Sequence, residues 1–176
     1  GIAWEALAYY KDRGFSSGFT SVNASRTVVT AALDQFDVPA TAWGLHGEVR
    51  ADLAATVNLS VGFDARTARG TTNEYFRNLG AGFTRLREAG GSQRTIGGFA
   101  ELSWQATPAL LLTAGGRIDG WKLYHGRRIE TSLASGAITN QPLVPDRSGT
   151  LWSARAGLAW QMAPAWSVRA AAYRGT

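Results

Sequence analysis

The 176-residue sequence contains no cysteine. It can therefore form no disulfide, thiolate metal site or cysteine nucleophile. Lysine is also scarce, with only Lys11 and Lys122 against 16 arginines, and the formal net charge is +5. A basic excess can indicate binding to nucleic acid or to an anionic surface. Because the charges are spread along the whole chain, we expect no nucleic-acid partner.

Long apolar runs are missing as well. No stretch approaches the ~18 apolar residues that a membrane-spanning helix requires, and the mean hydropathy is −0.12. A chain of this kind can cross a bilayer only as strands. The sequence also lacks an initiator methionine and a recognisable signal peptide. We therefore expect a piece of a longer protein, truncated at both ends.

What the sequence does contain is repeated alternation of apolar and polar residues. In residues 56–66, for example, Val57, Leu59 and Val61 alternate with Asn58 and Ser60. This period of two is typical of a strand with one apolar face. Seven segments show it: 2–11, 43–53, 56–66, 96–105, 110–123, 151–161 and 166–174. Most are near the ~9–11 residues that a tilted strand needs to cross a bilayer.

The connections between these segments alternate in length. Three are tight turns, at 52–56, 106–109 and 162–165, and two of them contain a proline. The other three are long and rich in Gly, Ser, Thr, Asn and Arg, at about 13–42, 67–95 and 124–150. We expect these to be loops, parts of which extend the strands. Short turns at one end and long loops at the other are typical of outer-membrane barrels, in which the short turns are periplasmic.

Tryptophan positions fit this arrangement. Trp104, Trp160 and Trp166 adjoin the short turns, whereas Trp43, Trp121 and Trp152 lie near the long connections. Indole rings favour the membrane–water interface, so we expect two aromatic bands at opposite ends of the strands. The alternative is that these rings form the core of a soluble β-sandwich.

Charged residues recur on the face opposite the apolar one. An arginine facing lipid at the membrane midplane costs about 2–4 kcal/mol, so we expect these side chains to face a wide, hydrated or plugged lumen. The predicted lumen-facing residues are Glu48, Arg50, Asp64, Arg66, Glu101, Arg117, Asp119, Arg155 and Arg169. Pairing with one another across strands is the expected role of most of them.

A series of short motifs resembles the mid-barrel region of TonB-dependent outer-membrane receptors. The motifs are QFDVPA (35–40) followed by WG (43–44), GFDAR (62–66), REAGG (87–91), GFAELSW (98–104), TAGGRID (113–119) and RAAAYR (169–174). The resemblance implies an all-β fold, in which an antiparallel up-and-down meander of about seven long strands forms part of a transmembrane β-barrel. Residues 1–176 would be a partial barrel domain without the plug domain.

The resemblance also implies a function. Such receptors sit in the outer membrane of Gram-negative bacteria, in contact with its lipid. They bind scarce nutrients such as iron–siderophore complexes or cobalamin and import them with energy from the TonB system, which contacts the missing plug. The alternatives are a passive outer-membrane porin or channel and a soluble β-sandwich binding module.

The long connections supply the candidate ligand contacts. Guanidinium groups suit carboxylate, catecholate-like or phosphate groups, and aromatic side chains add stacking surfaces. The predicted ligand-binding residues are Arg69, Tyr75, Arg77, Arg85, Arg87, Tyr124, His125 and Arg127, for an anionic ligand or metal chelate. Binding of the arginines to lipopolysaccharide phosphates or to acidic neighbours is the alternative.

No catalytic, cofactor-binding or metal site is expected. The two histidines, His46 and His125, lie in different segments, and neither H-E-x-x-H nor G-x-S-x-G occurs. Paired carboxylates such as Asp64 and Glu101 could suggest glycosidase chemistry. Barrel lumens carry such pairs routinely, so we expect no enzyme.

Overall fold

The computed structural model describes residues 1–175 as one antiparallel sheet of ten strands, which confirms the predicted all-β meander. The predicted domain ends at Thr176, which lies outside the described residues. The strands are β1 (Ile2–Arg13), β2 (Ser17–Val22), β3 (Val29–Asp37), β4 (Ala40–Ala54), β5 (Val57–Asn78), β6 (Phe83–Thr107), β7 (Leu110–Ser132), β8 (Ile138–Asn140), β9 (Arg147–Ala163) and β10 (Trp166–Arg174). No helix within residues 1–175 is long and apolar enough to span a membrane.

Seven strands form the continuous path of the sheet, in the order β1-β4-β5-β6-β7-β9-β10. They contain the seven alternating segments of the sequence. The β2–β3 hairpin is attached to this path through β3, which pairs with β5, and β8 pairs with β7. The described residues therefore form a single sheet, in which the two stacked layers of a β-sandwich do not occur.

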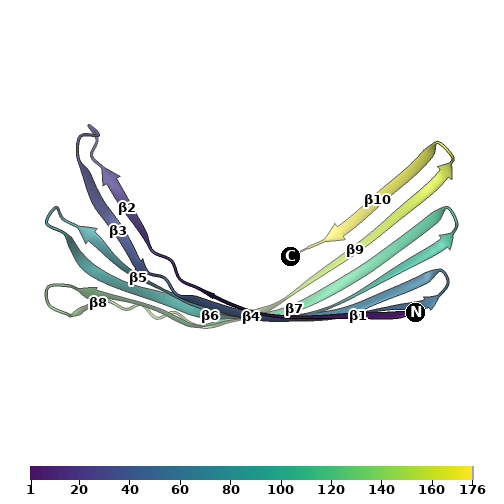
Figure 1. The fold of residues 1–176 in the computed structure, drawn as a ribbon, viewed down its shortest axis with the longest axis horizontal. Helices are drawn as coiled ribbons and strands as arrows, with labels where there is room; N and C mark the ends of the chain where they lie inside the picture. The colour runs from purple at the N-terminus through teal and green to yellow at the C-terminus, as the bar shows by residue number, and fades with distance from the viewer. Residues whose placement is uncertain (176) are drawn as a thin grey trace.

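The two ends of the sheet differ. The short β4–β5, β6–β7 and β9–β10 turns lie together at the right of Figure 1, whereas the β2–β3 and β5–β6 hairpins and β8 lie at the left. The three tight turns thus occur where the sequence predicted them. The sheet bends between the two ends, so that both rise to the same side in this view.

The prediction of a long loop over residues 67–95 is wrong. β5 continues to Asn78 and β6 begins at Phe83, and the two strands pair without a register shift from Thr67 opposite Arg94 to Phe76 opposite Arg85. Only residues 79–82 connect them. There the Asn78 Oδ1 accepts the backbone N–H groups of Gly80 and Gly82 at 2.9 and 3.2 Å, and both glycines have positive φ, as such a tight connection demands.

The other two long connections also contain strands. In 13–42 the β2–β3 turn is held by Asn23, whose Oδ1 accepts the N–H groups of Thr27 and Val28. In 124–150 β7 runs to Ser132, and a short coil over 141–146 follows β8. These hairpins carry polar residues on both faces, so their sequences lack the alternation that marks a strand with one apolar side.

The sheet has no hydrophobic core within residues 1–175, since none of its apolar side chains is buried. Large apolar side chains instead gather on one face and stay 40–73% exposed, among them Trp43, Val61, Leu102, Trp104, Ile118, Trp152, Trp160 and Trp166. Trp104, Trp160 and Trp166 stand at the short turns, with Trp43 and Trp152 toward the hairpins.

Trp121 departs from the expected aromatic band. It alternates in register with Asp119 and shares a pocket lining with Asp119 and Arg117, so it lies on the charged face. Its indole covers Gly149 of β9, its cross-strand partner, whose hypothetical Cβ would stand 2.9 Å from the Trp121 ring. The ring therefore packs in the space that a missing side chain leaves.

The same pairing of an aromatic ring with a facing glycine recurs at the centre of the sheet. Phe99 covers Gly62, and Phe63 covers Gly47 on the other face. Any side chain at Gly62 would meet the Phe99 ring at 2.4 Å. Rings that cover strand glycines supply the packing that the glycines cannot. These pairs therefore hold neighbouring strands together, one pair on each face of the sheet.

Candidate functional site

The face opposite the apolar one is charged, and we call it the polar face. All nine residues predicted to face a lumen lie on it, because cross-strand partners and alternate residues share a side. The registers Glu48–Gly62–Phe99–Arg117 and Ser60–Glu101–Gly115–Arg155 show this across four strands each.

The centre of the polar face is an ion-pair network around Arg117. Its guanidinium lies 2.6 Å from Asp64 on β5 and donates two hydrogen bonds, of 2.7 and 2.5 Å, to Asp119 on its own strand. Each of the three side chains is about one-third exposed or less. The arginine thus serves two carboxylates and links β7 to β5 across the intervening β6.

A second cluster joins β1 and β4. The Nε2 of His46 lies 3.6 Å from Glu5 and 3.9 Å from Glu48, and these three groups could together hold a metal ion. The sequence did not predict this cluster, since its members come from two strands. Arg50 already donates two hydrogen bonds to Glu48 and lies 3.7 Å from Glu5. The arginine supplies the positive charge, so the cluster is explained without a metal.

Toward β10, Arg155 donates a hydrogen bond to Glu101 across β7. The residue between them in the register is Gly115, which has no side chain to separate the two groups.

The hairpins carry a third cluster on the same face, formed by β3, β5, β6 and β7. Glu74 is only 4% exposed, accepts hydrogen bonds from Gln35 and Arg87, and is the one buried charged residue within 1–175. Arg87 also lies 3.6 Å from Glu130 and over the Phe76 ring. Burial raises the pKa of Glu130, but hydrogen bonds from Arg128 and Asn140 outweigh it, so the pKa is below its ordinary value.

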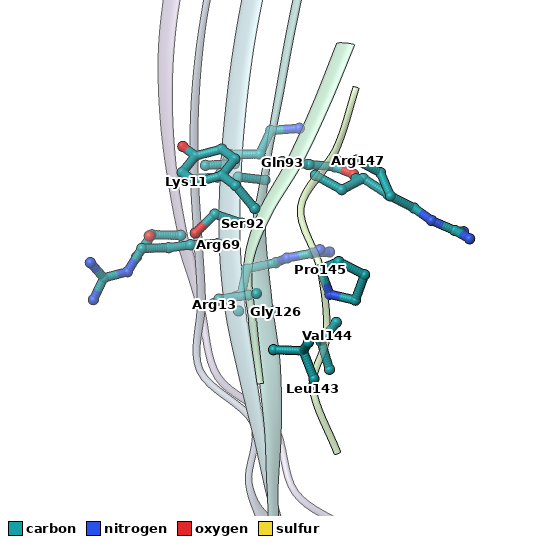
Figure 2. A pocket seen from close by; sticks show the side chains of 18 residues that line it. Lys11, Arg13, Arg69, Ser92, Gln93, Gly126, Leu143, Val144, Pro145 and Arg147 are labelled. Atoms are coloured by element: carbon teal, nitrogen blue, oxygen red, sulfur yellow. The ribbon is translucent and has the colours of Figure 1, made fainter. Parts of the chain in front are cut away.

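Between this cluster and the central network lies a pocket of about 670 Å³, which we call the basic pocket. Two register rows form its floor, Lys11–Ala42–Ala68–Gln93–Leu123–Arg147 and Arg13–Ala40–Gly70–Gly91. Cations stand at both margins of the floor, and most of the residues between them are Ala or Gly. Val144 and Pro145 form one wall, and Val144 packs directly on Gly126 of β7 (Figure 2).

The basic pocket differs from the clusters around it because no acidic residue lines it. Lys11, Arg13 and Arg147 are exposed and form no ion pair with a described carboxylate; Lys11 instead lies over the Tyr9 ring. Sequence reasoning did not select these three cations. The signal was present, since Lys11 and Arg13 continue the polar set of the first segment.

The eight predicted ligand-binding residues do not form one cluster. Arg85 and Arg87 lie on the polar face, whereas Arg69, Tyr75 and Arg127 lie on the opposite one. Figure 2 shows Arg69 and Arg147 projecting from opposite sides of the sheet.

The remaining members of that set are held locally. Tyr75 stacks between Phe36 and Phe83, and Arg127 pairs with Glu88 at 2.6 Å. Arg77 and His125 have positive φ at irregular points of their strands. The Tyr124 ring contacts both His125 and Lys122, and Tyr124 also lines the basic pocket.

Comparison with solved structures supports the fold. The ferric yersiniabactin uptake receptor FyuA from Yersinia pestis superposes with a TM-score of 0.71 at 14% identity, over 97% of this chain and 25% of that one. The ferric-catecholate import receptor Fiu from E. coli K12 gives 0.69 at 15% identity, over 99% of this chain and 33% of that one. The chain thus spans a quarter to a third of the length of these receptors.

The sequence itself gives the family. No curated protein matches it significantly, but the family model described as TonB dependent receptor-like, beta-barrel matches residues 2–176. That family consists of transport receptors, which bind ligands and interact with TonB, and not of enzymes. With a charged and an apolar face on one meander of strands, and nearly every residue matched, the chain belongs to the TonB-dependent receptor β-barrel family.

Proposed function

We propose that this chain is part of the barrel of an outer-membrane receptor that imports a scarce nutrient, such as an iron–siderophore complex, into a Gram-negative cell. In this proposal residues 1–176 are a partial barrel domain. Further strands, and a plug that contacts the TonB system, belong to the rest of the protein. The apolar face contacts lipid and the polar face lines the lumen, with the short turns on the periplasmic side.

The observation that carries the proposal is the basic pocket. Its cations lack carboxylate partners, while the arginines of the neighbouring clusters have them. Unpaired cations around a smooth Ala and Gly floor favour an anionic ligand with a flat or apolar body. Its place on the hairpin side of the central network would put it toward the outside of the membrane.

The predicted ligand-binding residues extend this proposal. Arg85 and Arg87 share the polar face with the pocket, and we propose that these two arginines contact the ligand. Tyr124 borders the pocket, but its side chain shares the opposite face with Ser92. Tyr75, Arg77, Tyr124, His125 and Arg127 would shape the surrounding hairpins.

The test is uptake by cells that express the full-length receptor and lack their own ferric-chelate receptors. The probes are ⁵⁵Fe-labelled ferric tris-catecholate, a ferric hydroxamate and cobalamin. We expect Arg13→Gln with Arg147→Gln to raise the half-saturating concentration of an anionic chelate by roughly tenfold, since an electrostatically focused site loses two charges. Arg26→Gln, at the exposed β2–β3 turn, is the matched control and should leave uptake unchanged.

The same assay separates active import from a passive channel. Active import through TonB requires the proton-motive force, so a protonophore should abolish uptake. Uptake that survives the protonophore and does not saturate would favour the porin alternative and contradict the proposal.

A further inference from the structure

Three cations stand on adjacent strands on the apolar side of the sheet. Arg94 of β6 and Lys122 of β7 are direct cross-strand partners, and Arg69 of β5 lies one step diagonal to Arg94 because it faces Ser92. All three side chains are exposed. Like charges directly opposite each other on one face destabilise a ladder. An anion between them would remove that repulsion.

An apolar surface borders this group directly. Trp43 stands in the same register row, as Trp43–Thr67–Arg94–Lys122, and Ile96, Ile118 and Trp152 follow on the same face toward the short turns. These four apolar side chains are 43–59% exposed. Cations next to an apolar band match the two parts of a lipid, an anionic headgroup above apolar chains.

The acidic residues nearby do not neutralise the group. Asp146 lies 3.1 Å from the Lys122 ammonium and also accepts the His125 N–H, whereas Arg69 and Arg94 form no ion pair with any acidic residue in 1–175. Three cations and one carboxylate leave a formal charge of +2. The next cation along the face, Arg127, is paired with Glu88.

We propose that Arg69, Arg94 and Lys122 bind a phosphate group on the headgroup of a membrane lipid whose acyl chains cover the apolar face beside Trp43 and Ile96. The guanidinium forks of the two arginines suit phosphate oxygens, and the lysine adds a point charge. This inference rests on the proposed membrane location of the sheet. It assigns the three side chains to the lipid side of the barrel. Arg69 also lines the basic pocket, but its side chain projects from the opposite side of the sheet to Arg147 (Figure 2).

The experiment titrates the full-length receptor, in neutral detergent, with diphosphoryl lipid A and counts bound lipid by native mass spectrometry. Arg94→Gln with Lys122→Gln should weaken binding roughly 25-fold, at about fivefold for each charge. Arg94→Lys with Lys122→Arg keeps both charges and should bind within about twofold of wild type. Asp146→Asn keeps the oxygen that accepts the His125 N–H and should tighten binding.

Wild-type affinity in the Arg94→Gln, Lys122→Gln receptor overturns the inference. So does displacement of the lipid by an equal concentration of inorganic phosphate, which would identify a site for free phosphate. A receptor that shows the heat-modifiable gel migration of a folded barrel but binds lipid without regard to these charges overturns this inference alone. A wild-type receptor without that migration overturns the proposed barrel function as well.

Discussion

The centre of the polar face and the basic pocket carry the same type of side chain in opposite situations. At the centre, Arg117 lies between Asp64 and Asp119, and Phe99 covers Gly62 in the same register row. In the pocket, Arg13 and Arg147 have no carboxylate partner, and the floor glycines are not covered by a ring. At the centre, the carboxylates of Asp64 and Asp119 neutralise the arginine within the protein. The unpaired region has charge and space left for a ligand, which is why we propose that the ligand binds there.

The largest effect should follow from removing the central arginine. Arg117→Leu leaves two part-buried carboxylates without a countercharge and should cost about 2–3 kcal/mol, less than the ~3–5 of a fully buried pair. Denaturant-induced loss of heat-modifiable migration in the full-length receptor measures it. Arg155→Leu is the control. The Arg155 side chain, which pairs with Glu101, is 70% exposed, so its loss should lower the free energy of unfolding by under about 1 kcal/mol. If the two variants lost equal free energies of unfolding, the central network would be no more stabilising than an exposed ion pair.

A smaller effect should distinguish the covered from the open glycines. Gly62→Ala places a Cβ 2.4 Å from the Phe99 ring and 2.8 Å from a backbone oxygen, whereas at Gly70 the nearest atom is 3.4 Å away. Overpacking at Gly62 should cost about 1–3 kcal/mol, and Gly70→Ala should stay within about 0.5 kcal/mol. The same unfolding assay measures both. If Gly70→Ala proved the more damaging, the pocket floor would be packed and not open.

The smallest effect concerns pH. A hydrogen bond from Lys122 holds the pKa of Asp146 below its ordinary value, so the folded carboxyl binds its proton at a lower pH than the unfolded one. The contribution of this contact is complete above the ordinary carboxyl range near pH 4 and is lost as pH falls through the lower folded pKa. The Tm difference between wild type and Asp146→Asn should stay constant from about pH 7 to 5 and shrink below about pH 4. A difference that persists at low pH would have another cause.

The sequence was informative wherever one side of a strand is apolar. Residues 56–66 and 151–161 alternate clearly, and the structure contains both in the strand path. The charged set around Arg117 was assigned to one face by the same alternation. In 67–95, by contrast, polar residues stand on both faces of the hairpin, such as Glu74 on one face and Asn73 on the other, so no hydrophobic period marks the strands.

The site was harder to predict than the fold. Residue type and position in the long connections indicate candidate ligand residues, but only the strand register shows on which face of the sheet each one lies. Trp121 is a second example. Its position near a long connection indicates an interfacial ring, but it stands two residues from Asp119 on β7 and therefore lies on the charged face. One wall of the basic pocket forms because Val144 packs on Gly126. The alternation of residues along a strand does not predict this contact.

The order of strands in the sheet has a consequence for how the chain assembles. From β4 through β7, each strand pairs with its immediate successor, so this region can form by successive closing of hairpins, with little chain entropy lost at each step. Pairing of β1 with β4 must wait until the inserted β2–β3 hairpin has been looped out. We therefore expect the middle strands to associate early and β1 to join late, which would make the first strand the slowest to gain protection from hydrogen exchange.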